Sequence, residues 1–154
     1  MVSADIWGIS ERRWRLRNYG GRFTLTEAEA RTFAVDWIGA WNAHDLNRIL
    51  SHYSTGVLFS SPFVAALGAE AEGCIRGRAA LQRYFSTALD AFPTLAFRLR
   101  AVFRGVDALT LVYDSVNGLV AAETMLLDHA GQVTRVWALY DDNRETRPLP
   151  VKEG

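Results

Sequence analysis

The chain is poor in features that would tie it to an oxidising compartment, a membrane or a charged partner. It has one cysteine among 154 residues, so no internal disulfide can form, and this fits a reducing cytoplasm. Lysine plus arginine and aspartate plus glutamate number 17 each, so no net field attracts nucleic acid or an anionic membrane. No apolar run approaches the ~18 residues of a spanning helix, and the N-terminus lacks the apolar core of a signal peptide. We therefore expect a soluble, cytoplasmic protein that binds neither nucleic acid nor membrane.

Patterns that hold a metal or a cofactor are also missing. The histidines His44, His52 and His129 lack the spacing of a metal site with a matching third ligand. No glycine-rich loop follows a strand and opens a helix, as nucleotide binding requires. No histidine lies near Cys74 in the sequence, so we interpret this thiol as a small buried or loop residue. The sequence predicts no metal and no cofactor.

The chain does have a hydrophobic content of 49%, enough for one domain with a core. Thr26 and Glu29 form a capping-box pattern that predicts the start of a helix, and Asp45 predicts the N-cap of a short second helix. The predicted elements are helices over about 27–41, 46–53 and 78–92, a strand over 57–61, a loop over 62–77 and strands over about 95–104, 108–116, 119–127 and 132–141. Three helices followed by an antiparallel meander indicate an α+β protein.

Residues 108–128 are the most informative stretch, because two apolar runs meet there at Asn117-Gly118. This dipeptide favours a two-residue type I′ turn, which would place Asp114 opposite Ala121 and Val112 opposite Glu123. Side chains alternate between the faces of a strand. One face would then carry Thr110, Val112, Asp114, Ala121, Glu123 and Met125. We therefore expect Asp114 and Glu123 to be diagonal neighbours roughly 7–8 Å apart in an apolar setting.

The opposite face of the predicted sheet is too apolar to face water. It would carry Leu111, Tyr113, Arg135, Trp137 and Leu139. Exposed apolar surface of this extent predicts a partner, most simply a second copy of the chain, so we expect a homodimer through the outer sheet face.

The first 23 residues differ from the rest of the chain. Arginines alternate there with Trp14 and Tyr19 in ERRWRLRNYGGRF, residues 11–23. Such a segment can bind single-stranded nucleic acid. On a neutral protein we favour an arm that packs on its own domain or on a partner subunit.

Four segments, taken in order, resemble one known family: WNAHDLNRILSHY, FSSPF, GRAALQRYF and the meander that ends in GQVTRVWALYDD. Over residues 26–142 the chain resembles the SnoaL-like branch of the nuclear-transport-factor-2-like superfamily. The resemblance implies a cone-shaped α+β fold, in which three N-terminal helices pack on a curved, mainly antiparallel sheet that encloses an apolar pocket. We assign the pocket domain to residues 24–145, an N-terminal arm to 1–23 and a C-terminal tail to 146–154.

The resemblance also places functional positions of the superfamily on this chain. The general base of the steroid isomerases falls on Ser61, and their oxyanion-hole tyrosine and acid fall on Trp37 and Glu123. One supporting tyrosine matches Tyr53, and Phe85 replaces another. Two further positions concern the cyclases and the limonene-type epoxide hydrolases: their essential aspartate falls on Ala138, and the hydrolases' arginine falls on Asp114. Both usual base positions therefore lack a carboxylate, whereas the Glu123 position keeps its acid.

Glu123 is consequently the main catalytic candidate. In an apolar pocket its pKa would be raised, so that it could donate a proton to a carbonyl oxygen that gains charge. The alternative is a structural carboxylate bound to a tyrosine or an arginine. Asp114 is either a catalytic base or a solvated carboxylate at the rim, and Tyr140, in phase with Ala138, could donate a hydrogen bond. The predicted substrate-binding residues are Trp37, Trp41, Tyr53, Phe59, Ser61, Phe63, Phe85, Val112, Met125 and Ala138.

These observations favour a cofactor-independent acid–base enzyme, of cyclase or isomerase type, that acts on a small hydrophobic carbonyl compound in a deep pocket. Glu123 would be the acid, and Asp114 or a bound water the base. The rival interpretation is a non-catalytic module of the same fold that binds a small molecule or dimerises. A nucleic-acid-associated protein that works through its basic arm is the third.

Overall fold

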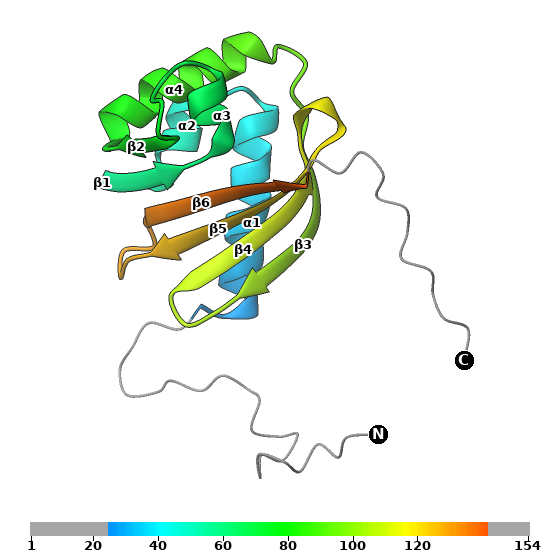
Figure 1. The fold of residues 1–154 in the computed structure, drawn as a ribbon. Helices are drawn as coiled ribbons and strands as arrows, with labels where there is room; N and C mark the ends of the chain where they lie inside the picture. The colour runs from blue at the N-terminus through cyan, green and yellow to red at the C-terminus, as the bar shows by residue number, and fades with distance from the viewer. Residues whose placement is uncertain (1–24, 142–154) are drawn as a thin grey trace, which may run out of the picture.

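The computed structural model describes residues 25–141. The predicted N-terminal arm (1–23) and C-terminal tail (146–154) lie outside the described residues. The described part is an α+β fold, as predicted, with helices packed against one six-stranded sheet (Figure 1).

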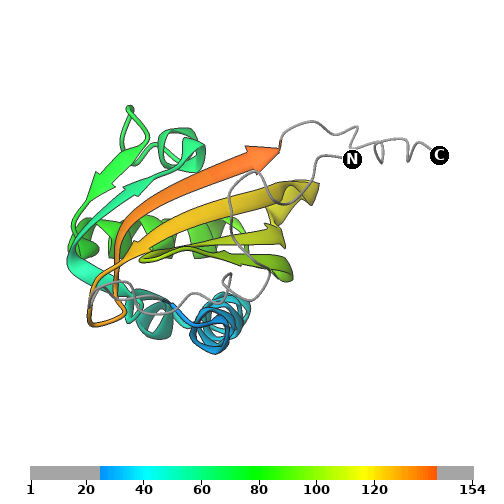
Figure 2. The same cartoon turned by 90° about the horizontal axis from the view of Figure 1, so that it is seen from below.

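The sheet has the strand order β2-β1-β6-β5-β4-β3. Its strands are β1 (Tyr53–Ser60), β2 (Cys74–Arg76), β3 (Arg98–Arg104), β4 (Ala108–Asp114), β5 (Val120–Leu127) and β6 (Val133–Asp141). The strands β3 to β6 form the predicted antiparallel meander, and β1 joins β6 in parallel. Figure 2 shows that the sheet is curved. A curved sheet leaves room between its inner face and the helices.

Two long helices cover the inner face of the sheet. They are α1 (Glu27–Asn42), which packs against β3, and α4 (Arg78–Ala91), which packs against β1. The capping box predicted for α1 is present, because the Thr26 hydroxyl accepts a hydrogen bond from the Glu29 amide and the Glu29 carboxylate accepts one from the Thr26 amide. The short helix α2 (Leu46–Leu50) is capped by Asp45 as predicted.

Two short elements fall within residues 62–77, which were predicted to be a loop. Helix α3 (Pro62–Ala66) begins where the Ser61 hydroxyl accepts a hydrogen bond from the Phe63 amide and proline occupies the first turn. Both features favour a helix start, because they satisfy or remove amides that have no partner in the helix. Strand β2 adds three residues to the edge of the sheet beside β1.

The predicted two-residue turn between β4 and β5 is wrong by one residue. Asn117 and Gly118 do have positive φ angles, 57° and 71°. They belong to a three-residue loop, Val116–Gly118, which is closed by a hydrogen bond from the Ser115 amide to the Leu119 carbonyl. Loops of this length also place a residue in the left-handed region, so the dipeptide alone does not fix the length of the turn.

Because the loop has one residue more than predicted, each side chain of β4 lies on the face of the sheet opposite to the predicted one. Glu123 pairs with Leu111 and not with Val112, and Ala121 pairs with Tyr113 and not with Asp114. Glu123 keeps its predicted inward direction. Val112 and Asp114, predicted inside, lie on the outer face, whereas Leu111 and Tyr113, predicted outside, are buried inside. Arg135, Trp137 and Leu139 lie on the outer face as predicted, where the Arg135 guanidinium lies 4.9 Å from the centre of the Trp137 ring.

Candidate functional site

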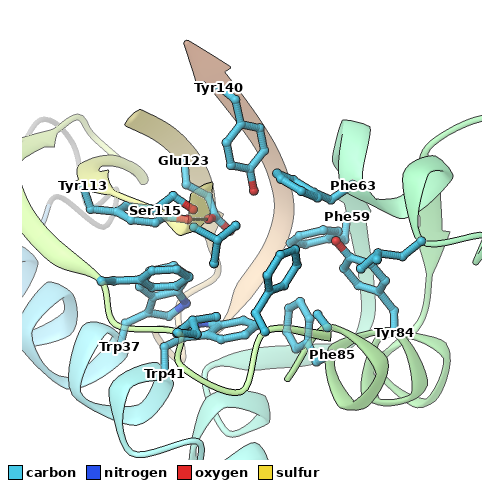
Figure 3. Close-up of a pocket in the computed structure, with 16 residues that line it drawn as sticks. Trp37, Trp41, Phe59, Phe63, Tyr84, Phe85, Tyr113, Ser115, Glu123 and Tyr140 are labelled. Carbon is cyan, nitrogen blue, oxygen red and sulfur yellow. Dashed lines mark hydrogen bonds between the residues drawn. The ribbon is translucent and has the colours of Figure 1, made fainter. Parts of the chain in front are cut away.

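A pocket opens between the inner face of the sheet and the helices (Figure 3). The space between its side chains is about 470 Å³ with the open mouth included, but the room for the centre of a water molecule is only about 50 Å³. The pocket is therefore a narrow slot between rings. Its lining residues are Trp37, Trp41, Phe59, Phe63, Leu67, Tyr84, Phe85, Ala88, Phe92, Leu95, Phe97, Tyr113, Ser115, Val116, Glu123 and Tyr140.

Glu123 is the one carboxyl group that lines this slot within residues 25–141. Its side chain projects from β5, and the residue is only 3% exposed. The Tyr113 hydroxyl donates a hydrogen bond of 2.7 Å to Glu123 Oε2. Burial raises the pKa of Glu123 to about 7, although the hydrogen bond from Tyr113 acts in the opposite direction. Near neutral pH this carboxyl can therefore both hold and release a proton.

Tyrosines bring several hydroxyl groups into the pocket around Glu123. Tyr113 on β4 and Tyr140 on β6 pair with the same residue, Ala121 on β5, from opposite sides. Figure 3 shows their hydroxyls pointing toward the carboxyl end of Glu123. Burial raises the pKa of both tyrosines above the usual value, and the Glu123 charge raises it further. They are therefore neutral hydrogen-bond donors.

The floor of the pocket is aromatic. Trp37 and Trp41, one helical turn apart on α1, pack against Phe97 with ring centres 6.0 and 5.6 Å from it. The Trp37 indole N–H donates a hydrogen bond of 2.9 Å to the Tyr53 hydroxyl, which fixes the ring. Flat apolar walls with few polar groups suit a flat hydrophobic ligand.

Seven of the predicted site residues line the pocket. They are Trp37, Trp41, Phe59, Phe63, Phe85, Glu123 and Tyr140. Four others, Tyr53, Ser61, Met125 and Ala138, are buried next to the pocket but do not line it.

Asp114 and Val112 do not belong to this pocket, because the shifted register places both on the outer face of β4. Asp114 forms ion pairs there with Arg98 (2.7 Å) and Arg100 (2.6 Å). Hydrogen bonds from these guanidinium groups hold its pKa below the usual value. The predicted pair of carboxylates on one face is therefore wrong.

Sequence reasoning missed two tyrosines of the pocket, Tyr113 and Tyr84. Tyr113 was assigned to the outer face by the wrong register. Tyr84 lies within the helix predicted over 78–92, but no feature of the sequence assigned it to the pocket. With a three-residue loop, strand alternation places Leu109, Leu111 and Tyr113 on the same face as Glu123. This signal could have assigned Tyr113 to the pocket.

Two further findings bear on cofactors and membranes. Within residues 25–141, no three His, Cys, Asp or Glu side chains lie close enough together to hold a metal ion. In the same part of the chain, no helix has the length and apolarity needed to cross a membrane.

The curved sheet, the covering helices and the enclosed slot define a protein of the nuclear-transport-factor-2-like superfamily. Residues 34–142 match the family model of the SnoaL-like domain, and the chain belongs to this family. The comparison with curated proteins gives no match.

Solved structures support the same conclusion. A SnoaL-like protein of unknown function from Burkholderia thailandensis is 36% identical, with a TM-score of 0.73 over 77% of this chain and 98% of that one. A candidate ketosteroid isomerase from Kribbella flavida is 17% identical (TM-score 0.59; 80% of this chain, 84% of that one). AclR, a candidate hydroxylase from Streptomyces galilaeus, is 18% identical (TM-score 0.59; 75% and 81%). The last two show only a shared fold.

Proposed function

We propose that this protein is a cofactor-independent acid–base enzyme, of isomerase or cyclase type, that acts on a small hydrophobic carbonyl compound. The observation that carries the proposal is the Glu123 carboxyl, buried in an aromatic slot with its pKa raised to about 7. The fold that this chain shares with a candidate ketosteroid isomerase provides a pocket in which such a reaction could occur, but the proposal depends on the site.

Glu123 in its protonated form donates a hydrogen bond, and then a proton, to the carbonyl oxygen of the substrate as that oxygen gains negative charge. A positioned acid of this kind contributes on the order of 10²–10⁴-fold to the rate. Tyr113 already donates to the other side of the same carboxyl, so it stabilises the carboxylate once the proton has left.

A water molecule in the slot takes the proton from carbon and passes it to the Glu123 carboxylate, so that the enol forms and the acid is restored. Asp114, the other base considered, lies on the outer face of the sheet and is paired with two arginines. Ser61 and Ala138 occupy the usual base positions of the superfamily, and neither side chain can act as a carboxylate base. Activity should therefore be independent of Asp114.

Exchange of α-protons on a flat ketone tests this proposal. 2-Tetralone in D₂O is followed by proton NMR with and without enzyme. We expect the wild-type protein to accelerate exchange, and the Glu123→Gln variant to lose at least about tenfold of that acceleration. Asp114→Asn is the matched control and should retain it. Equal rates for wild type and Glu123→Gln would refute the catalytic role.

The rival function is a non-catalytic module that binds a small hydrophobic molecule. It is favoured by the absence of a second carboxyl from the lining residues within 25–141. Such a module would bind 2-tetralone, detected by quenching of Trp37 and Trp41 fluorescence, without any exchange.

We also propose that the chain forms a homodimer through the outer sheet face. Trp137, Leu139 and Phe103 expose 37%, 56% and 61% of their area on this face, and apolar surface of this kind favours association. Light scattering on wild type and Leu139→Asp tests the proposal. A dimer that becomes a monomer in the variant is the expected result, and a monomeric wild type contradicts it.

A further inference from the structure

One polar group of the pocket stands apart from the others. Of the lining residues that carry a hydroxyl or a carboxyl group, four lie on the meander or directly after β4: Tyr113, Ser115, Glu123 and Tyr140. The remaining one is Tyr84, on α4. The other residues that α4 adds to the lining, Phe85 and Ala88, are apolar. The Tyr84 hydroxyl is therefore the one polar side-chain group that α4 contributes to the slot.

Tyr84 and Glu123 lie at opposite ends of the slot. The contacts between rings run from Tyr84 through Phe85, Trp41 and Phe97 to Tyr113, with successive ring centres 5.7, 4.8, 5.6 and 4.7 Å apart. Tyr113 is the residue that donates to Glu123. Figure 3 shows Glu123 and Tyr84 on opposite sides of the pocket. An apolar stretch of rings therefore separates two polar ends.

The Tyr84 hydroxyl is able to bind a ligand at its end of the slot. Figure 3 shows it directed into the pocket. Burial raises the pKa of Tyr84 above the usual tyrosine value, and a hydrogen bond with Ser61 acts in the opposite direction. The hydroxyl therefore keeps its proton near neutral pH. A tyrosine hydroxyl can donate one hydrogen bond and also accept, so one bond to Ser61 leaves capacity for a ligand oxygen.

We propose that the ligand of this pocket is a flat, fused-ring ketone with a hydroxyl group at the end remote from the ketone, and that Tyr84 binds this hydroxyl. The ketone lies at Glu123, as in the proposed function on which this inference rests. The rings of the ligand lie along Phe97, Trp41 and Phe85. Tyr84 is thus a specificity-determining residue that touches the ligand but not the reacting atoms.

The chemical reason is the cost of an unmatched polar group in an apolar place. A ligand that ends in a hydrocarbon covers the Tyr84 hydroxyl without bonding to it, whereas a ligand hydroxyl restores the hydrogen bond that both groups would otherwise make with water. A site built around such a bond discriminates against the analogue that lacks it. A phenylalanine at position 84 would fill nearly the same space, so discrimination should depend on the hydroxyl alone.

The test compares two ligands of similar size, 6-hydroxy-2-tetralone and 6-methyl-2-tetralone. Their substituent lies across the fused rings from the ketone. Isothermal titration calorimetry gives both dissociation constants, and the quantity of interest is the constant of the methyl compound divided by that of the hydroxy compound. We expect Tyr84→Phe to lower this ratio at least about tenfold relative to the wild type. Changes in packing affect both ligands and cancel in the ratio.

Thr87→Val is the matched control. Thr87 lies on the same helix, is exposed and does not line the slot, and its hydroxyl donates to the Arg83 carbonyl (3.1 Å). The variant removes a hydroxyl from α4 with little change of shape, so its ratio should equal that of the wild type.

An unchanged ratio in Tyr84→Phe overturns the inference, and so does a wild type that does not bind 6-hydroxy-2-tetralone. A ratio that falls in Glu123→Gln but not in Tyr84→Phe also overturns it, because the ligand hydroxyl would then lie at Glu123. Binding is measured without turnover, so the two proposals can fail separately. A lowered ratio in Tyr84→Phe without any exchange of 2-tetralone protons supports this ligand class and refutes the enzyme. Exchange that depends on Glu123 with an unchanged ratio does the reverse.

Discussion

Replacing Glu123 with glutamine should flatten the pH dependence of the free energy of unfolding. In the unfolded chain this carboxyl ionises with the ordinary glutamate pKa of 4.5, whereas in the folded protein it ionises at about 7. Between these values the folded state holds a proton that the unfolded state has lost. The free energy of unfolding of the wild type therefore falls as the pH rises through this window.

The size of the effect follows from the two pKa values. They differ by roughly 2.5, and each pKa unit corresponds to ~1.36 kcal/mol, so the carboxyl costs the folded state about 3 kcal/mol above pH 7. Glutamine cannot ionise, so the variant avoids this cost. The pKa of about 7 already includes the hydrogen bond from Tyr113, so that contact needs no separate correction. At pH 8 we expect Glu123→Gln to be more stable than wild type by about 3 kcal/mol.

Urea unfolding at a series of pH values, followed by tryptophan fluorescence, measures this effect. At each pH the free energy of unfolding of the wild type is subtracted from that of the variant, so contributions from other titrating groups cancel. The carboxyls of Asp36 and Asp114 have lowered pKa values and titrate below this window. The difference should be small at pH 4.5 and grow toward pH 7. A difference that stays constant from pH 4.5 to 8 would refute the raised pKa.

The remaining predictions concern single contacts around the site and the turn. Tyr113→Phe removes the hydrogen bond that stabilises the ionised carboxyl, so the pKa of Glu123, measured by NMR, should rise above that of the wild type; a lower value would contradict the contact. Asn117→Val places a β-branched residue at a φ of 57° and should lower the free energy of unfolding by ~1–2 kcal/mol in urea, whereas Asn117→Gly should change it little. Trp37→Phe leaves the Tyr53 hydroxyl without its donor and should cost ~1 kcal/mol beyond the loss of ring area; a urea midpoint lowered only as far as the lost ring area requires would show that the bond contributes nothing.

The sequence alone predicted the helices and strands that depend on residues close together in the chain. The capping residues Thr26 and Asp45 begin their helices as expected, because each cap needs only the next three residues. The meander followed from strand alternation and short turns. The Glu123 side chain points inward as both the strand pattern and the family resemblance indicated.

The register between β4 and β5 could not be obtained in the same way. Asn117 and Gly118 fit both a two-residue and a three-residue loop, and the choice depends on which face of β4 is buried against α1. Tyr113 fills the space next to Trp37, with ring centres 5.4 Å apart, while Asp114 pairs with Arg98 and Arg100 on the other face. These are contacts between distant segments, and local propensity does not encode them.

The central claim is that Glu123 is an acid with a pKa near neutrality inside the slot. The most direct measurement is the pH titration of its side-chain carboxyl carbon by NMR, with Glu123→Gln to assign the signal. A midpoint close to 7 is the predicted result. A midpoint at or below the ordinary glutamate value of 4.5 would contradict the claim, because the carboxyl would then be ionised throughout the neutral range and unable to donate a proton.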